Sequence, residues 1–234
     1  MKIVLLHGQD HKGSTYHIAR QVADKIQGTN DITEFFFPRD LPYFCKGCYN
    51  CIEDDTKCPY YEAKHAIFQK LEEADVIICS TPVYCMHISA ALKSFFELTF
   101  DNWMVHRPKA VMFSKRAAVV STAAGSSAKH SMKEVEDSLF NLGIPSISKF
   151  GLPVHAMNWD GINDKTKARI DKATTRLAKK LSACSKPRVG LKTKFMFNLM
   201  GFLQKKNMGS SPVEKEYWES HGWLGKARPW KTSS

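Results

Sequence analysis

Residues Lys2–Tyr16, KIVLLHGQDHKGSTY, set the pattern on which the fold prediction rests. Lys2–His7 is a short apolar run of the kind that lies inside a parallel sheet. Gly8 ends this predicted strand, and Ser14 and Thr15 supply capping chemistry for a helix with apolar residues at helical spacing. The loop between them offers glycines, hydroxyls and exposed backbone amides, which suits a phosphate group but also serves as an ordinary helix start.

The alternation of strand and helix continues along the chain. The later predicted strands are Asp31–Phe37, Ala74–Ser80, Arg116–Thr122 and Ser146–Phe150. The later predicted helices are Tyr60–Glu73, Ile88–Phe100, Lys129–Leu142 and Asn163–Ser182. This pattern favours a doubly wound α/β fold, with a five-stranded parallel sheet covered by helices on both faces. In such sheets, ligands bind beyond the carboxyl ends of the strands.

Composition and charge divide the chain into two parts. Hydrophobic residues make up 43% of the 234 residues and charged residues 24%, which excludes a disordered protein. The net charge of +11 raises the question of a polyanionic partner. However, residues 184–234 hold ten Lys and Arg against three Asp and Glu, so most of the excess lies there. We therefore predict an α/β domain over 1–183 and a basic, aromatic-rich C-terminal extension over 184–234.

Two interpretations of the extension remain open. Phe195–Leu203 is strongly apolar and is bracketed by lysines, as in a helix that lies on a membrane surface. Packing against the domain or a second subunit is favoured, because tryptophans follow at Trp218, Trp223 and Trp230. We expect no nucleic-acid partner, since no groove-reading motif is visible. No apolar run is long enough to span a bilayer and no leader pattern is visible, so we expect a cytoplasmic protein.

Three loops are predicted to leave the carboxyl ends of strands. Residues of the first loop with polar or small side chains are Gln9, His11, Gly13, Ser14, Thr15 and Tyr16. The second loop follows the third strand and contains Pro82, Val83, Tyr84, Cys85, Met86 and His87. The third follows the fourth strand and contains Thr122, Ala123, Ala124 and Gly125, whose small side chains let a flat ligand approach the backbone.

Taken in order, the three loops resemble those of the flavodoxin-like NADPH-dependent FMN reductase family, over about residues 1–182. The first is similar to the family pattern G-S-x-R-x-x-S/N-T, Thr81–Tyr84 to S-P-V-Y, and Thr122–Gly125 to T-x-G-G. The resemblance implies that the first loop holds the phosphate of FMN and that the other two hold its ring system. His11 stands where the family commonly has arginine, and Lys12 is a candidate substitute.

The resemblance implies an enzyme that accepts electrons from NADH or NADPH on bound FMN. The electrons then pass to a small acceptor, such as a quinone, a nitro or azo compound or free flavin, or to a redox partner. No catalytic acid or base is needed and none is assigned, and His87 is interpreted as structural rather than as a flavin contact. A homodimer is also implied, and we expect Asp101, Asn102, Trp103 and Arg107 at the dimer face.

A loop of cysteines forms a separate candidate site. Four of the seven cysteines, Cys45, Cys48, Cys51 and Cys58, have the spacing C-x2-C-x2-C-x6-C. Such spacing suits a 4Fe–4S cluster, zinc less well, and the alternative is a set of free or redox-active thiols.

The cysteine spacing also resembles the compact motif of iron–sulfur flavoproteins, in the same FMN-binding superfamily. It implies a second function, an electron carrier with a 4Fe–4S cluster beside FMN. A non-enzymatic redox sensor or membrane-docking module is the third alternative. The remaining thiols are interpreted as inert at Cys79 and Cys184, and as packed rather than reactive at Cys85.

Overall fold

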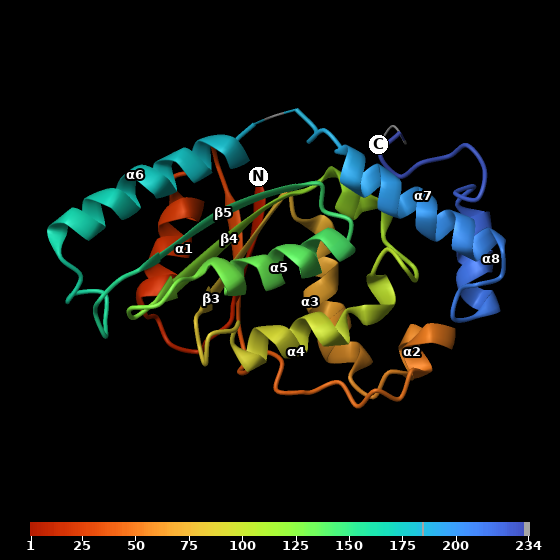
Figure 1. The fold of residues 1–234 in the computed structure, drawn as a ribbon, viewed down its shortest axis with the longest axis horizontal. Coiled ribbons are helices and arrows are strands. Elements are labelled where there is room, and N and C mark those ends of the chain that lie inside the picture. The colour runs from red at the N-terminus through yellow and green to blue at the C-terminus, as the bar shows by residue number, and fades with distance from the viewer. Residues whose placement is uncertain (184, 232–234) are drawn as a thin grey trace.

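The computed structural model describes residues 1–183 and 185–231. Its centre is a parallel sheet with the strand order β2-β1-β3-β4-β5 (Figure 1). The strands are β1 (Lys2–His7), β2 (Asp31–Phe36), β3 (Val76–Pro82), β4 (Arg116–Ala123) and β5 (Ser146–Pro153). Each lies where the sequence predicts a strand, which confirms the doubly wound α/β fold.

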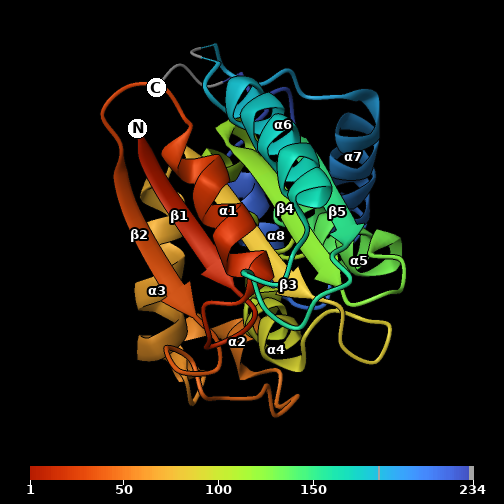
Figure 2. The ribbon, with the colours of Figure 1, turned by 90° about the vertical axis from the view of Figure 1, so that its left-hand side faces the viewer.

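Helices cover both faces of the sheet, and alternation within the strands explains why. Ile3 and Leu5 of β1 pack into one apolar cluster with α1 (Ser14–Asp24) and α6 (Asp164–Leu181), the two helices in front of the sheet in Figure 2. Val4 and Leu6 point the other way. They join the cluster formed with α3 (Tyr61–Glu73), α4 (Ala90–Leu98) and α5 (Lys129–Asn141).

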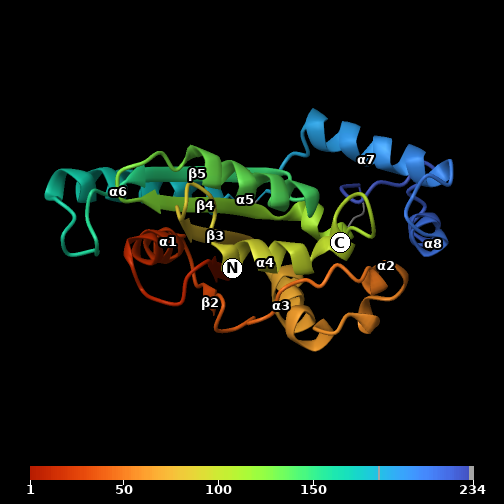
Figure 3. The same cartoon turned by 60° about the horizontal axis from the view of Figure 1, so that its bottom comes forward.

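The C-terminal extension packs against its own α/β domain. Its helices, α7 (Leu191–Lys205) and α8 (Pro212–Ser220), lie together at the end of the molecule away from α6 (Figures 1 and 3). Their aromatic side chains meet Met104 and Phe113 of the domain in a third apolar cluster. Trp218 is fully buried there, and its indole N–H donates a hydrogen bond of 2.7 Å to the carbonyl oxygen of His106.

A buried polar group joins the same two parts of the chain. A Glu214 carboxylate oxygen lies 2.5 Å from Nδ1 of His106, and the second oxygen accepts from Gln204 and from the amide of Ser210. Burial raises the pKa of Glu214, but these hydrogen bonds and the charge of His106 outweigh it, so that the pKa lies below its ordinary value. The extension is thus held by both apolar and hydrogen-bonded contacts.

The outward face of α7 exposes large apolar side chains. Its exposed side chains include Leu191, Phe195, Leu199 and Phe202. The alternative of a surface-seeking helix stays a prediction for that face, and so does the domain division at residue 183. Within the described residues, no helix combines the length and hydrophobicity that a membrane span requires.

Candidate functional site

The predicted site loops gather at the carboxyl edge of the sheet. The first joins β1 to α1, the second joins β3 to α4 and the third joins β4 to α5. Two buried hydroxyls hold the first and third together, since Thr15 Oγ1 and Thr122 Oγ1 are 2.5 Å apart. The amide of Val83 donates to the carbonyl oxygen of Thr122 at 2.8 Å, which ties in the second loop.

The first loop leaves the amino end of α1 open to a ligand. Gly13 is the N-cap, and no side chain among the described residues caps this helix. The prediction that Ser14 and Thr15 cap it is wrong, because both lie inside the first turn and the Thr15 hydroxyl is bonded to β4. The first amides of a helix have no partner within the helix, so they and the helix dipole favour an anion here.

Close packing of this loop on α4 depends on Gly8. A Cβ at Gly8 would lie 2.4 Å from Oγ of Ser89, the N-cap of α4. Gln9 and Tyr16 are buried, whereas His11 and Lys12 are exposed. The two basic side chains are therefore accessible to a phosphate bound at α1.

A buried histidine, His7, lies at the end of β1 where the first loop begins. His7, the last residue of β1, contacts Ser80 Oγ through Nδ1 at 2.8 Å and Glu34 through Nε2 at 2.9 Å. Its ring stacks on Phe36, and burial lowers its pKa although Glu34 acts in the opposite direction. Sequence reasoning assigned His7 only to a strand, because its partners come from β2 and β3 and no local pattern links them.

The second loop forms a projecting turn. Tyr84 and His87 exchange backbone hydrogen bonds of 3.0 and 2.9 Å, and the two residues between them, Cys85 and Met86, both have positive φ. All four of these residues are exposed. Packing was the favoured role for Cys85, and it is wrong, since this thiol lies at the tip of the turn. Pro82 is buried in β3, so the ring-facing candidates of this loop are the residues beyond it.

The third loop combines buried and open positions. Thr122 and Ala123 belong to β4 and are buried, whereas Ala124 and Gly125 are exposed. A Cβ at Gly125 would meet nothing within 4 Å. The backbone beyond β4 is thus accessible to a flat ligand.

A fourth loop, between β5 and α6, reaches the same edge. The amide of His155 donates to the carbonyl oxygen of Ala124 at 2.9 Å, and the ring of Trp159 lies 5.1 Å from that of His17 on α1. Sequence reasoning did not include this loop. The position of Trp159 shortly after the fifth predicted strand was a usable signal, because that strand also ends at the carboxyl edge.

The cysteine loop runs along α4 rather than across its amino end. Cys45 and Cys51 line a groove with Phe96 and Phe100, and α2 (Asn50–Glu53) lies within the loop. The flavin-loop candidates surround the amino end of α4, which is nine residues and about 14 Å long. In Figure 1 the loop accordingly passes beneath α4 towards α8.

The four loop cysteines carry free thiols. Cys45 and Cys48 are exposed, and Cys51 and Cys58 are half-buried. Burial raises the pKa of Cys51 to about 11, and the charges of Asp101, Cys58 and Cys45 add to this shift. Cys45 and Cys58 therefore both lie within electrostatic reach of Cys51. Outside the loop, Cys79 is fully buried and burial raises its pKa, in keeping with an inert thiol, while Cys184 lies outside the described residues.

Two of the predicted dimer-face residues make hydrogen bonds or ion pairs within their own chain. Asp101 is buried, and its carboxylate pairs with Nζ of Lys64 at 2.8 Å. The guanidinium of Arg107 donates to the carbonyl oxygen of Cys51. Asp101 is therefore wrongly assigned to a dimer surface, because its side chain already lies in the interior.

Comparison with known proteins identifies the family. The family model for NADPH-dependent FMN reductase matches residues 1–156. The chain belongs to this family. It is accordingly an FMN-dependent NAD(P)H oxidoreductase, as the three loops imply.

Two curated relatives resemble this chain, and both are iron–sulfur flavoproteins. An iron–sulfur flavoprotein of Methanocaldococcus jannaschii is 29% identical over 82% of this chain and 91% of its own length. An iron–sulfur flavoprotein of Archaeoglobus fulgidus is 24% identical over 42% of this chain and 48% of its own length.

Solved structures share the fold of this chain. An FMN-dependent NADH-azoreductase from Bacillus anthracis in complex with FMN superposes with a TM-score of 0.56 at 12% identity, covering 76% of this chain and 100% of its own. An NAD(P)H:quinone oxidoreductase from Methanothermobacter marburgensis gives a TM-score of 0.55 at 13% identity, covering 76% of this chain and 96% of its own.

Proposed function

We propose that this oxidoreductase holds FMN across the four loops at the carboxyl edge of the sheet and passes electrons to a small acceptor. The observation that carries the proposal is the uncapped amino end of α1, which Gly8 and the Thr15–Thr122 contact bring beside the exposed backbone at Ala124 and Gly125. Bound FMN supplies the electron-accepting and electron-donating chemistry.

The residues of the chain have distinct roles in this proposal. The amides of Ser14, Thr15 and Tyr16 bind the phosphate, with His11 and Lys12 adding positive charge. Residues 83–87 and 122–125 border the ring and leave one side open to the nicotinamide and the acceptor. The acceptor class includes quinones, azo and nitro compounds and free flavin, in keeping with the azoreductase and quinone oxidoreductase that share the fold.

A charge introduced at the phosphate site tests this role. Ser14→Asp places a carboxylate in the first turn of α1, where an acidic side chain stabilises a helix but repels a phosphate. We expect the variant to keep its thermal stability and to lose FMN affinity by at least about tenfold, measured by fluorescence titration of the apoprotein. Gly190→Asp is the matched control, because it adds the same charge at the N-cap of α7, where a Cβ meets nothing within 4 Å.

Unchanged FMN affinity in Ser14→Asp would contradict phosphate binding at α1. Steady-state oxidation of NADH and NADPH with a quinone, an azo dye and free FMN then ranks the acceptors. If the FMN-loaded wild type oxidises neither nucleotide with any of them, the small-acceptor role is wrong.

A second candidate function is supported by the cysteine loop. Four free thiols of the right chemistry lie on one loop, and both curated relatives are iron–sulfur flavoproteins. Cys45, Cys48, Cys51 and Cys58 would be the ligands of a 4Fe–4S cluster, which supplies one-electron transfer when bound. Redox proteins are the expected acceptors in that case.

Anaerobic purification separates the two candidates. A cluster predicts about four irons per chain and visible absorbance that dithionite bleaches. Both should be lost in Cys48→Ser and kept in Cys85→Ser, an equally exposed thiol outside the loop. Flavin absorbance without iron supports the small-acceptor function.

Assembly and location complete the proposal. We propose a homodimer, to be tested by light scattering. We also propose a cytoplasmic location, because the exposed thiols of the cysteine loop suit a reducing compartment.

A further inference from the structure

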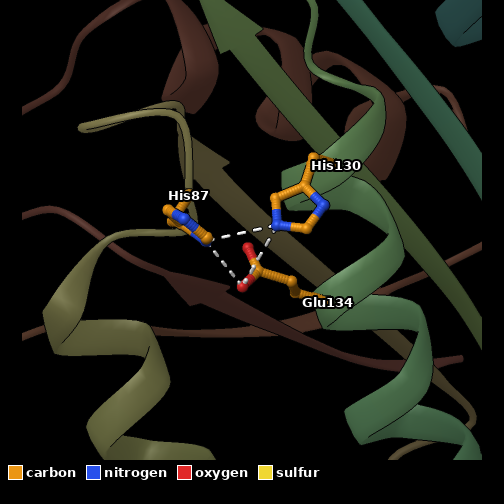
Figure 4. Close-up of side chains that lie close together, drawn as sticks. All are labelled: His87, His130 and Glu134. Carbon is orange, nitrogen blue, oxygen red and sulfur yellow. Dashed lines mark hydrogen bonds and ion pairs between the residues drawn. The ribbon is translucent and has the colours of Figure 1, made fainter.

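Two histidines and a glutamate converge beside the second loop (Figure 4). His87 ends the projecting turn after β3, while His130 and Glu134 lie one helical turn apart on α5. Nδ1 of His87 is 3.0 Å from Oε1 of Glu134 and 3.2 Å from Nε2 of His130. Nε2 of His130 is 3.8 Å from the same Glu134 oxygen.

These distances match the geometry of a metal site. An ion that binds nitrogen and oxygen tetrahedrally at about 2.0–2.1 Å holds its ligand atoms about 3.3–3.4 Å apart. The three observed separations, 3.0, 3.2 and 3.8 Å, lie on both sides of that value. Small rotations of exposed side chains suffice to make them equal, because each histidine side chain is 60% exposed.

Hydrogen bonds among the three atoms cannot pair all of them at once. A proton on His87 Nδ1 can be shared with Glu134, but His87 then has no lone pair to offer His130. A proton on His130 Nε2 can be shared with His87, but His87 then has no proton to offer Glu134. A divalent cation accepts a lone pair from each ring nitrogen and from the carboxylate at the same time. Two imidazoles and one carboxylate are also a ligand set that zinc uses with a fourth position left open.

The protein fixes the glutamate for this role. Its second oxygen, Oε2, accepts from the amide of Ile88 at 3.0 Å, which leaves Oε1 directed at the two histidines. Hydrogen bonds to the outer atom of a ligand orient metal-binding groups in this way. The backbone exchange between Tyr84 and His87 likewise fixes the turn that carries His87.

We propose that His87, His130 and Glu134 bind a divalent first-row transition ion of the zinc type, with the fourth position open to solvent. The ion connects the second loop to α5 and thereby restrains the turn from Tyr84 to His87. Binding of the ion does not depend on the proposal that the protein binds FMN. Its effect on FMN affinity rests on the proposed function, because only then does this turn border the ring.

Cobalt(II) titration of the apoprotein tests the site. The cysteine loop is the rival ligand, but cobalt on thiolates shows an intense sulfur-to-metal band that a nitrogen and oxygen site lacks. The wild type is compared with His130→Ala and Glu134→Gln, and with His65→Ala on α3 as the control histidine. His130 is exposed and Glu134 is half-buried on α5, and melting curves check that the variants fold.

We expect one ion per chain with visible bands free of the sulfur signal. Its affinity should fall at least about tenfold in His130→Ala and Glu134→Gln and stay unchanged in His65→Ala. Equal affinity in all four proteins, or a cobalt spectrum with only the sulfur band, would overturn the site. A separate FMN titration, with and without zinc, tests the effect on the flavin loop. If zinc leaves the FMN affinity unchanged, the proposed restraint on the turn is wrong, but the metal site stands on the cobalt measurement.

Discussion

The carboxyl edge of the sheet and the C-terminal extension differ in how their polar groups are used. At the edge, α1 begins without a side-chain cap, and the turn at Cys85 and Met86 projects with positive φ. In the extension, the Trp218 indole has an acceptor on the α/β domain, and both Glu214 oxygens are hydrogen-bonded.

This difference separates a binding surface from a structural one. Groups without protein partners at an exposed edge are hydrated in the free protein and are available to a ligand. Groups paired inside the extension contribute to folding instead. We therefore expect changes in the extension to alter stability and changes at the edge to alter flavin binding.

Trp218→Ala should have the largest effect on stability. The substitution empties the centre of the third cluster and leaves the His106 carbonyl without its donor, so we expect a loss of about 3–5 kcal/mol in the free energy of unfolding. Urea denaturation measures this loss. FMN affinity of the folded variant, at low denaturant, should stay within about twofold of the wild type. A large loss of affinity without loss of stability would break the comparison.

Gly8→Ala should affect both properties. The added methyl group lies 2.4 Å from Ser89 Oγ and 3.0 Å from Leu92 Cβ, so the first loop must move away from α4. We expect a loss of about 1–3 kcal/mol in stability. FMN affinity, measured by titration, should fall at least about tenfold. Gly190→Ala is the control, because it lies at the N-cap of α7, outside the flavin loops, and its methyl group meets nothing within 4 Å. An equal loss of affinity in both variants would show that the position of the first loop is irrelevant.

Much of this architecture could be predicted from the sequence. The sheet and both helical layers could be predicted from short apolar strands that alternate with amphipathic helices. Elements buried in such a fold show apolar residues at regular spacing in the sequence. The turn at Cys85 and Met86 could not be predicted, since neither residue is of the type that favours positive φ. The His87, His130 and Glu134 cluster joins residues from two elements and has no local signature.

The structure of the C-terminal extension could be predicted only in part from the sequence. Its tryptophans indicate burial but not the partner, and Met104 and Phe113 lie far away along the chain. One signal was overlooked: Ser211-Pro212 followed by Glu214 is typical of a helix start, and Ser211 is the N-cap of α8.

Glu214→Gln should have the smallest effect of the three, and a pH-dependent one. The variant loses the carboxylate on which His106 and Ser210 depend, at a cost of about 1–2 kcal/mol near neutral pH. The pKa of Glu214 in the folded chain lies below the ordinary 4.5, so the advantage of the wild type is complete above that pH and declines as pH falls through the lowered pKa.

Denaturation of both proteins across the acid range checks this dependence. Glu216→Gln, the same change at an exposed position of α8, serves as a control whose difference from the wild type should not follow that pH dependence. A constant difference between wild type and Glu214→Gln down to strongly acidic pH would contradict the stabilised carboxylate.

The packing of the extension has a consequence for synthesis of the chain. Met104 and Phe113 emerge from the ribosome long before Phe197, Trp218 and Trp223, which cover them in the finished protein. Throughout that interval, the nascent domain presents an uncovered apolar patch, a target for chaperones and a risk for aggregation. A chain terminated before α7 keeps the patch permanently, so loss of the last helices would appear in the cell as low abundance rather than as altered catalysis.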